Sequence, residues 1–170
     1  MLGIIGAGEL GLGVAKIAEA FGMKVFFAGL PGRSHSNQDS RMPFEVLLKE
    51  ADILSLHCPL TAETTKLIGA KELQSMKKSA FLINTARGGL IDEQALRNAL
   101  TEGIIAGAAL DVLSVEPPSE GNVLIDNYIP NLIVTPHVAW VALESRQRLV
   151  GQVVENVQGF LAGKPRNQVN

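Results

Sequence analysis

The chain has 170 residues, of which 46% are hydrophobic and 19% charged, so it can bury one good core and form one domain. Its formal net charge of -2, with 15 scattered Lys and Arg residues, argues against a nucleic-acid partner. No apolar run reaches the roughly 18 residues of a membrane span, and no basic signal-peptide region opens the chain. The single cysteine, Cys58, excludes an internal disulfide and a multi-thiolate metal site, which favours a reducing compartment such as the cytoplasm.

The first predicted element is a buried strand over residues 2–5, which leads into the glycine turn GAGELG at 6–11 and a helix over 14–21. In this setting the spacing G-x-G-x-x-G is typical of dinucleotide binding. The first glycine allows the tight turn, the second lets the backbone approach a pyrophosphate, and the third lets helix pack on strand. The free N–H groups of the first helical turn then face the phosphates. A glycine-rich turn that binds nothing is the alternative at this point.

Short apolar runs alternate with helix candidates along the rest of the chain. The further predicted strands cover residues 23–27, 53–56, 80–84, 104–110 and 132–134. The further predicted helices cover residues 43–49, 70–76, 92–102 with Asp92 as N-cap, and about 139–161. This alternation predicts an α/β fold of the Rossmann type, with a doubly wound parallel sheet. We assign residues 1–163 to this domain and 164–170 to a C-terminal tail, and we expect a polar surface loop at 29–42.

Ligands of such sheets bind at the carboxyl ends of the strands, so the residues just after each strand are candidates for a site. Arg87 follows the fourth predicted strand, Glu116 comes shortly after the fifth, and His137 follows the last. An imidazole can give a proton near neutral pH, and a carboxylate partner favours its protonated form. A guanidinium can fork onto a carboxylate or carbonyl oxygen. The plainer alternatives are a histidine bonded to backbone, a solvated loop carboxylate and an anion site before a helix.

Five blocks occur along the chain, GIIGAGELG, HCPLTAETTKLI, LINTARGGLIDEQAL, GAALDVLSVEPP and TPHVAW. In this order they resemble the nucleotide-binding domain of the D-2-hydroxyacid dehydrogenases, over about residues 2–163. The stretch HVAWVALESRQRL is most similar to the glycerate dehydrogenase, or hydroxypyruvate reductase, branch. The resemblance implies an oxidoreductase that transfers a hydride between NAD or NADP and a small D-2-hydroxy acid or 2-oxo acid, with no metal.

The resemblance also implies roles for individual residues. The family's catalytic trio falls on Arg87, Glu116 and His137. Its cofactor contacts fall on Gly6, Gly8, Glu9, Leu10, Gly11, Pro59, Thr64, Ala86, Arg87, Asp111, His137 and Trp140. For Asp111, near the nicotinamide in the family, the alternative is a structural strand-end acid. For Trp140, expected beside the pocket, the alternative is packing at a helix start.

One position departs from the usual dinucleotide site. Such a site generally ends its second strand with Asp or Glu, about 20 residues after the glycines, to hold the ribose hydroxyls. Here that place falls on Ala28 or Gly29, and Arg33 follows shortly after. Without a carboxylate, and with a guanidinium at hand, the site can accept a 2′-phosphate. We therefore add Gly29 and Arg33 to the cofactor residues and predict that NADPH is tolerated or preferred; the alternative is that NAD remains the cofactor.

In the family, this domain is inserted into a second, substrate-binding domain built from the preceding chain and the last few residues. The resemblance therefore implies a single domain that lacks the substrate-binding domain and has little activity alone. A stand-alone dinucleotide-binding module without turnover is the alternative from another class. We also expect a homodimer, through the long helix after His137 and the helix at 70–76.

Overall fold

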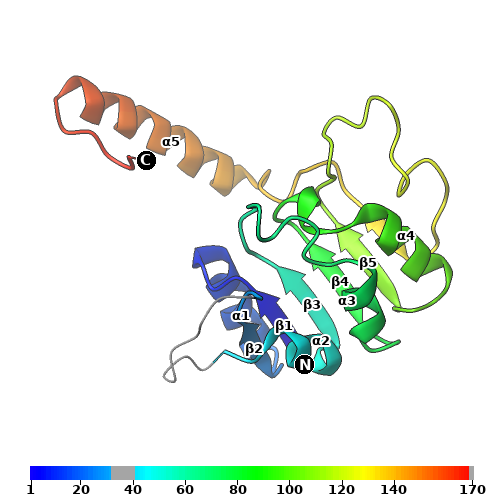
Figure 1. Ribbon diagram of the computed structural model, residues 1–170. Helices are drawn as coiled ribbons and strands as arrows, with labels where there is room; N and C mark the ends of the chain where they lie inside the picture. Colours follow the sequence, from blue (N-terminus) through cyan, green and yellow to red (C-terminus); the bar gives the residue numbers. More distant parts are fainter. Residues whose placement is uncertain (32–40, 169–170) are drawn as a thin grey trace. The chain divides into compact units, whose positions relative to one another are not determined.

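The computed structural model describes residues 1–31 and 41–168. Within this part of the chain, a six-stranded sheet has the order β2-β1-β3-β4-β5-β6, with every neighbouring pair parallel (Figure 1). The strands are β1 (Leu2–Ile5), β2 (Val25–Ala28), β3 (Ile53–Leu56), β4 (Phe81–Asn84), β5 (Gly107–Leu110) and β6 (Leu132–Val134). The predicted Rossmann-type sheet is thus confirmed. The order reverses between β1 and β3, which opens a crevice at their carboxyl ends.

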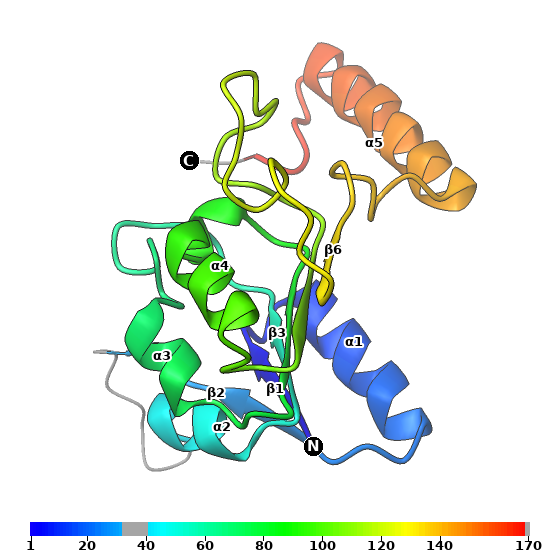
Figure 2. The same cartoon turned by 90° about the vertical axis from the view of Figure 1, so that its right-hand side faces the viewer.

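Helices cover both faces of this sheet (Figure 2). One face carries α1 (Glu9–Ala20), and the other carries α2 (Phe44–Glu50), α3 (Ala70–Ser75) and α4 (Glu93–Thr101). The side chains of each strand alternate between the two layers. In β3, for example, Leu54 is buried in the larger core beneath α2, α3 and α4, whereas Ile53 packs against the smaller cluster beneath α1.

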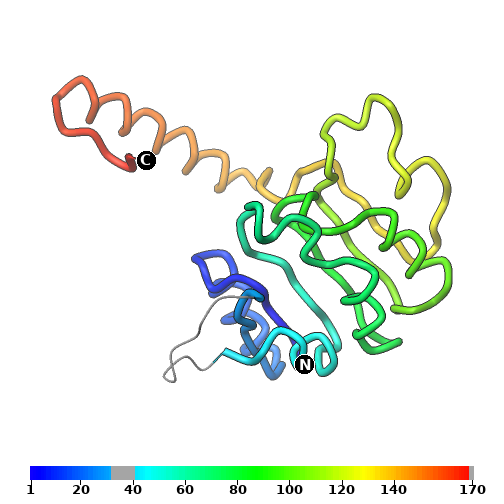
Figure 3. The backbone as a smooth tube through the Cα atoms, viewed as in Figure 1, coloured from blue at the N-terminus to red at the C-terminus, as the bar shows by residue number. Residues whose placement is uncertain are grey.

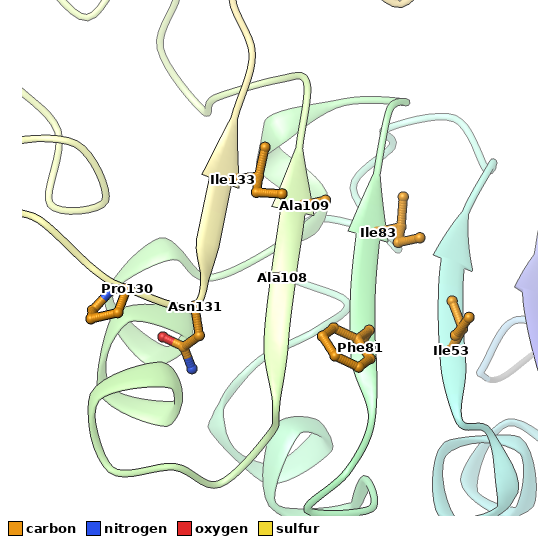
Figure 4. A pocket seen from close by; sticks show the side chains of 8 residues that line it. All are labelled: Ile53, Phe81, Ile83, Ala108, Ala109, Pro130, Asn131 and Ile133. Carbon is orange, nitrogen blue, oxygen red and sulfur yellow. The ribbon is translucent and has the colours of Figure 1, made fainter.

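Within the described part of unit Met1–Pro136, no helix covers the later strands on the face that carries α1. Ile53, Phe81, Ile83 and Ile133 project from neighbouring strands into a shallow cavity of about 300 Å³ (Figure 4). Phe81 is 49% exposed and Ile133 is 65% exposed, although both lie in the sheet. Since a doubly wound sheet is normally covered on both faces, this apolar surface is unusual for a parallel sheet.

Several element boundaries differ from the predicted ones. Helix α1 begins at Glu9 rather than residue 14, because Gly8 is its N-cap and the next two glycines lie inside the first turns. Strand β5 begins at Gly107 rather than residue 104, because the chain still closes the end of α4 there: Gly103 has a φ of +67°, and the N–H of Ile104 donates to the carbonyl of Ala99. Asp92 caps α4 as predicted, and its carboxylate accepts a hydrogen bond from the N–H of Ala95.

The chain divides into two compact units, Met1–Pro136 and His137–Asn170. The sheet and the buried core belong to the first unit. The second unit contains α5 (Leu143–Leu161), which starts later than predicted because a turn from Val138 to Val141 precedes its N-cap. Helix α5 buries none of its side chains. The expected domain boundary at residue 163 stays a prediction.

Candidate cofactor and active site

The turn between β1 and α1 is closely packed on one side and open on the other. Gly6 has a φ of +109°, and a Cβ there would lie 2.5 Å from the carbonyl oxygen of His57, after β3. A Cβ at Gly11 would collide with the carbonyl oxygen of Gly6. A Cβ at Gly8 would meet nothing within 4 Å, and no side chain caps the helix that begins at Glu9. The turn therefore presents backbone and a helix N-terminus to an open space, as a phosphate requires.

The segment after β3 forms the second wall. The hydroxyl of the buried Ser55 lies 2.9 Å from Nε2 of His57, which fixes the imidazole ring. Burial lowers the pKa of His57 below its ordinary value of 6.5, so the ring is held in its neutral form. Burial raises the pKa of the neighbouring Cys58 thiol, which favours the unreactive protonated form.

These segments and the turn after β4 enclose a cavity of about 670 Å³, within the range of small-molecule and cofactor sites. Its lining residues are Leu10, His57, Cys58, Pro59, Leu60, Thr85, Ala86 and Arg87. Four of the predicted cofactor residues, Leu10, Pro59, Ala86 and Arg87, are thereby brought together at the carboxyl ends of the strands. The cavity lies beside the β1–β3 crevice that the topology predicts.

The turn that carries Arg87 is held by a side chain that the sequence analysis missed. Asn84, fully buried at the end of β4, accepts a hydrogen bond from the N–H of Ala86 at 3.0 Å and donates one to the carbonyl of Arg87 at 2.9 Å. The exposed guanidinium of Arg87 donates to the carbonyl of Ala86. A polar residue closing an otherwise apolar strand is the signal that could have identified Asn84.

The long connection from β5 to β6, traced in Figure 3, carries two predicted acids. Asp111 is only 4% exposed, and the hydroxyl of Thr135 donates to its carboxylate at 2.6 Å. Glu116 is exposed and accepts a hydrogen bond at 2.7 Å from the N–H of Leu113. Glu93, in the first turn of α4, bonds to the same connection and was also missed by the sequence analysis.

Two further predicted residues lie in unit Met1–Pro136. Gly29, just after β2, is buried, and its N–H donates to the carbonyl of Met42 at 3.3 Å. Thr64 is 1% exposed, and its hydroxyl donates to the carbonyl of Pro59 and accepts from the N–H of Thr61, each at 2.7 Å. Arg33 lies outside the described residues.

The remaining predicted residues belong to the second unit. His137 is its first residue and has a φ of +54°, which is uncommon for a residue other than glycine. The indole N–H of Trp140 donates to the carbonyl of His137 at 3.0 Å. This bond fixes the backbone of His137 relative to Trp140, three residues later in the same unit.

The described part of the chain contains neither a membrane-spanning helix nor a cluster of metal-binding side chains. Among residues 1–31 and 41–168, no helix combines the length and apolar character that crossing a bilayer requires. The same part of the chain contains no group of three or more His, Cys, Asp or Glu side chains that could hold a metal ion.

Comparison with known proteins identifies this arrangement. Residues 1–139 match the sequence model of the D-isomer specific 2-hydroxyacid dehydrogenase, NAD binding domain. The chain is 54% identical to a glycerate dehydrogenase of Methylorubrum extorquens, over 99% of this chain and 52% of that protein. The chain thus spans about half the length of the curated relatives that it matches.

Solved structures of similar proteins support the same family. A D-isomer specific 2-hydroxyacid dehydrogenase from Lactobacillus delbrueckii ssp. bulgaricus, complexed with NAD, matches with a TM-score of 0.85 and 37% identity, over 99% of this chain and 55% of the other. An acyclic imino acid reductase in complex with NADPH and D-Arg matches with a TM-score of 0.81 and 38% identity, over 99% and 53%. The chain therefore belongs to the D-isomer-specific 2-hydroxyacid dehydrogenases, enzymes that act on small 2-hydroxy and 2-oxo acids, and it contains their NAD-binding domain.

Proposed function

We propose that this chain binds a nicotinamide dinucleotide in the 670 Å³ cavity and takes part in the reduction of a small 2-oxo acid of the glyoxylate or hydroxypyruvate type. The observation that carries the proposal is the open space at Gly8, beside a turn that Gly6 and Gly11 pack tightly on its other side. Only a backbone without a Cβ lets a pyrophosphate reach the N–H groups that begin α1. Glu9 and Leu10 supply the first of those groups.

The bound dinucleotide would supply the hydride, and the chain's own side chains bind and orient the substrate. Arg87 holds the substrate's carboxylate or carbonyl oxygen with its planar guanidinium. His137 gives a proton to the carbonyl oxygen, and Glu116 is the third member of the proposed catalytic set. Asp111 lies toward the nicotinamide carboxamide and Trp140 borders the pocket, whereas Thr64 acts by fixing the carbonyl of Pro59.

The chain accepts NADPH as well as NADH. The reason is the buried Gly29 after β2, where a dinucleotide site generally has a carboxylate that repels the 2′-phosphate. Arg33 supplies a guanidinium for that phosphate. The two structural neighbours support both cofactors, because one is complexed with NAD and the other with NADPH.

A second candidate is a dinucleotide-binding module without turnover, since the open space at Gly8 and the neighbouring cavity account for cofactor binding alone. Cofactor binding without oxidation of NADH by hydroxypyruvate or glyoxylate would select this candidate. In either case we expect a homodimer in the cytoplasm. The apolar side chains that α5 exposes, such as Val150, Val154 and Val157, and the helix α3 supply the dimer surface. Sedimentation at several concentrations measures this.

Calorimetric titration with NADH and with NADPH tests the proposal, using the parent chain, Gly8→Ala and Gly13→Ala. A Cβ at either glycine meets nothing within 4 Å in the chain itself, so both variants should fold. Gly8→Ala should weaken binding by about tenfold or more, because its methyl group occupies the phosphate's approach, whereas Gly13→Ala should bind as the parent does. Equal binding by both variants, or binding of neither cofactor by the parent, would overturn the proposal. An advantage for NADH of about tenfold or more would overturn the cofactor preference alone.

A further inference from the structure

Glu93 connects the start of α4 to the loop that carries Glu116. Its carboxylate accepts hydrogen bonds from the N–H of Ser114 at 2.8 Å, from the Ser114 hydroxyl at 2.6 Å and from the side-chain amide of Asn122 at 2.9 Å. Bonds to an ionised carboxylate are among the stronger hydrogen bonds of a protein. A single side chain therefore fixes this loop on both sides of Glu116.

The loop has little buried apolar surface between these two points. Ser114, Glu116 and Pro117 are exposed, and the apolar Val115 is 63% exposed. Apolar packing on the core resumes at Val123 and Leu124. The position of this segment consequently depends on polar contacts rather than on hydrophobic packing.

Both fixed points are themselves connected to ordered backbone. Asn122 accepts from the N–H of Leu124 at 2.9 Å, and its own N–H donates to the carboxylate of Asp126 at 3.0 Å. On the other side, the N–H of Leu113 donates to Glu116 itself. The carboxylate of Glu93 therefore holds Ser114 before Glu116 and Asn122 after it, and both residues lie next to ordered backbone.

We propose that Glu93 is a positioning residue, which sets the place and orientation of Glu116 without touching substrate or cofactor. The inference rests on the proposed role of Glu116. Glu93 lies outside the cavity that the cofactor would occupy, so its loss should affect the step that needs Glu116 and leave cofactor affinity unchanged.

Glu93→Gln tests this with little change in size. The amide keeps one acceptor oxygen but turns the other into an NH₂ group, which faces either the N–H of Ser114 or the NH₂ of Asn122, both of them donors. Glu102→Gln, at the other end of the same helix, is the matched control, because it makes the same charge change at an exposed residue away from the loop. Ser114→Ala removes the hydroxyl contact alone and should show a smaller effect in the same direction.

The first measurement is amide hydrogen exchange over residues 113–122 by mass spectrometry. We expect exchange to become about tenfold faster in Glu93→Gln, with α4 and β5 unchanged and with parent behaviour in Glu102→Gln. Unchanged exchange in Glu93→Gln would overturn the proposal whatever the chain's activity.

The second measurement is glyoxylate reduction with NADH. The turnover number should fall in Glu93→Gln at unchanged NADH affinity, and Glu93→Gln should add no further loss to Glu116→Gln, since the first residue acts through the second. Additive losses would overturn the positioning role. If Glu116→Gln leaves turnover unchanged, the proposed role of Glu116 fails. If the parent shows no turnover, the dinucleotide-binding module without turnover is selected instead. In both cases the exchange result still decides whether Glu93 fixes the loop.

Discussion

Gly88 and Leu113 are in backbone contact: a Cβ added at Gly88 would collide with the carbonyl group of Leu113. Gly88 directly follows Arg87 in the turn after β4, and Leu113 begins the loop that carries Glu116. The two segments with predicted catalytic residues in unit Met1–Pro136 are therefore packed against each other with no room for a side chain. Relaxing this contact would displace one segment from the other.

Gly88→Ala should accordingly lower the free energy of unfolding by about 1–3 kcal/mol, the usual cost of overpacking a rigid site. Urea denaturation measures this, with Gly13→Ala as the control. Gly13 is exposed inside α1, where the same change meets open space and should raise stability by about 0.5–1 kcal/mol. Equal effects of the two substitutions would contradict the contact.

Asn84→Ala should lower the free energy of unfolding by about 2–4 kcal/mol, because the N–H of Ala86 and the carbonyl of Arg87 both lose their partner and the truncation leaves a buried void. Asn98→Ala, on the exposed surface of α4, should change stability by no more than about 0.5 kcal/mol. Chemical denaturation of both variants checks the difference. Parent-like stability of Asn84→Ala would show that water replaces the amide in the turn.

The pKa of His57 predicts how stability depends on pH. Burial lowers this pKa below 6.5 in the folded chain, so between the folded value and 6.5 the unfolded chain binds more protons. The free energy of unfolding should therefore fall as the pH drops below about 6.5 and stop falling, for this group, below the folded pKa.

His57→Gln should remove this part of the pH dependence, whereas Ser55→Ala, which keeps the imidazole, should retain most of it. Urea denaturation between about pH 7.5 and about pH 5 measures the slope. Identical slopes for His57→Gln and the parent would show that the ring is as easily protonated in the folded chain as in the unfolded one.

The exposed apolar residues of the sheet predict a change in dye binding without a change in stability. Ile133→Lys should reduce the fluorescence of a dye that binds apolar surface, because Ile133 is a large part of the uncovered patch on β6. The free energy of unfolding should change by no more than about 0.5 kcal/mol, as for other exposed positions. Ile17→Lys on α1, an equally exposed isoleucine away from the patch, serves as the control and should leave the dye signal near that of the parent.

The sequence was sufficient for those features that depend on local pattern. Short apolar runs and their alternation with helices predicted the parallel sheet, and the spacing of Gly6, Gly8 and Gly11 predicted the turn between β1 and α1. Asp92 was recognisable as an N-cap because a cap acts on backbone only a few residues away. The resemblance to a family supplied the names of Arg87 and Glu116.

Other features were not predictable because they depend on contacts between distant segments. In the sequence, Glu93 has the pattern of an ordinary acid in the first turn of a helix. Its hydrogen-bond partners, Ser114 and Asn122, lie 21 and 29 residues further along the chain. In the sequence, Asn84 has the pattern of a polar residue that ends a strand, although its amide hydrogen-bonds the backbone of the turn that carries Arg87. The open apolar face was likewise hidden, because Phe81 and Ile133 have the same sequence pattern as buried strand residues.

The tight packing of Gly6 has a consequence for how a ligand is received. A Cβ at Gly6 would meet the carbonyl of His57, just after β3, and a Cβ at Gly11 in α1 would meet the carbonyl oxygen of Gly6, so neither position has room for a methyl group. A turn confined in this way has its shape before any ligand arrives, so association needs no loop ordering. Such a preformed socket loses little conformational entropy on binding, and more of the contact energy is then available as affinity.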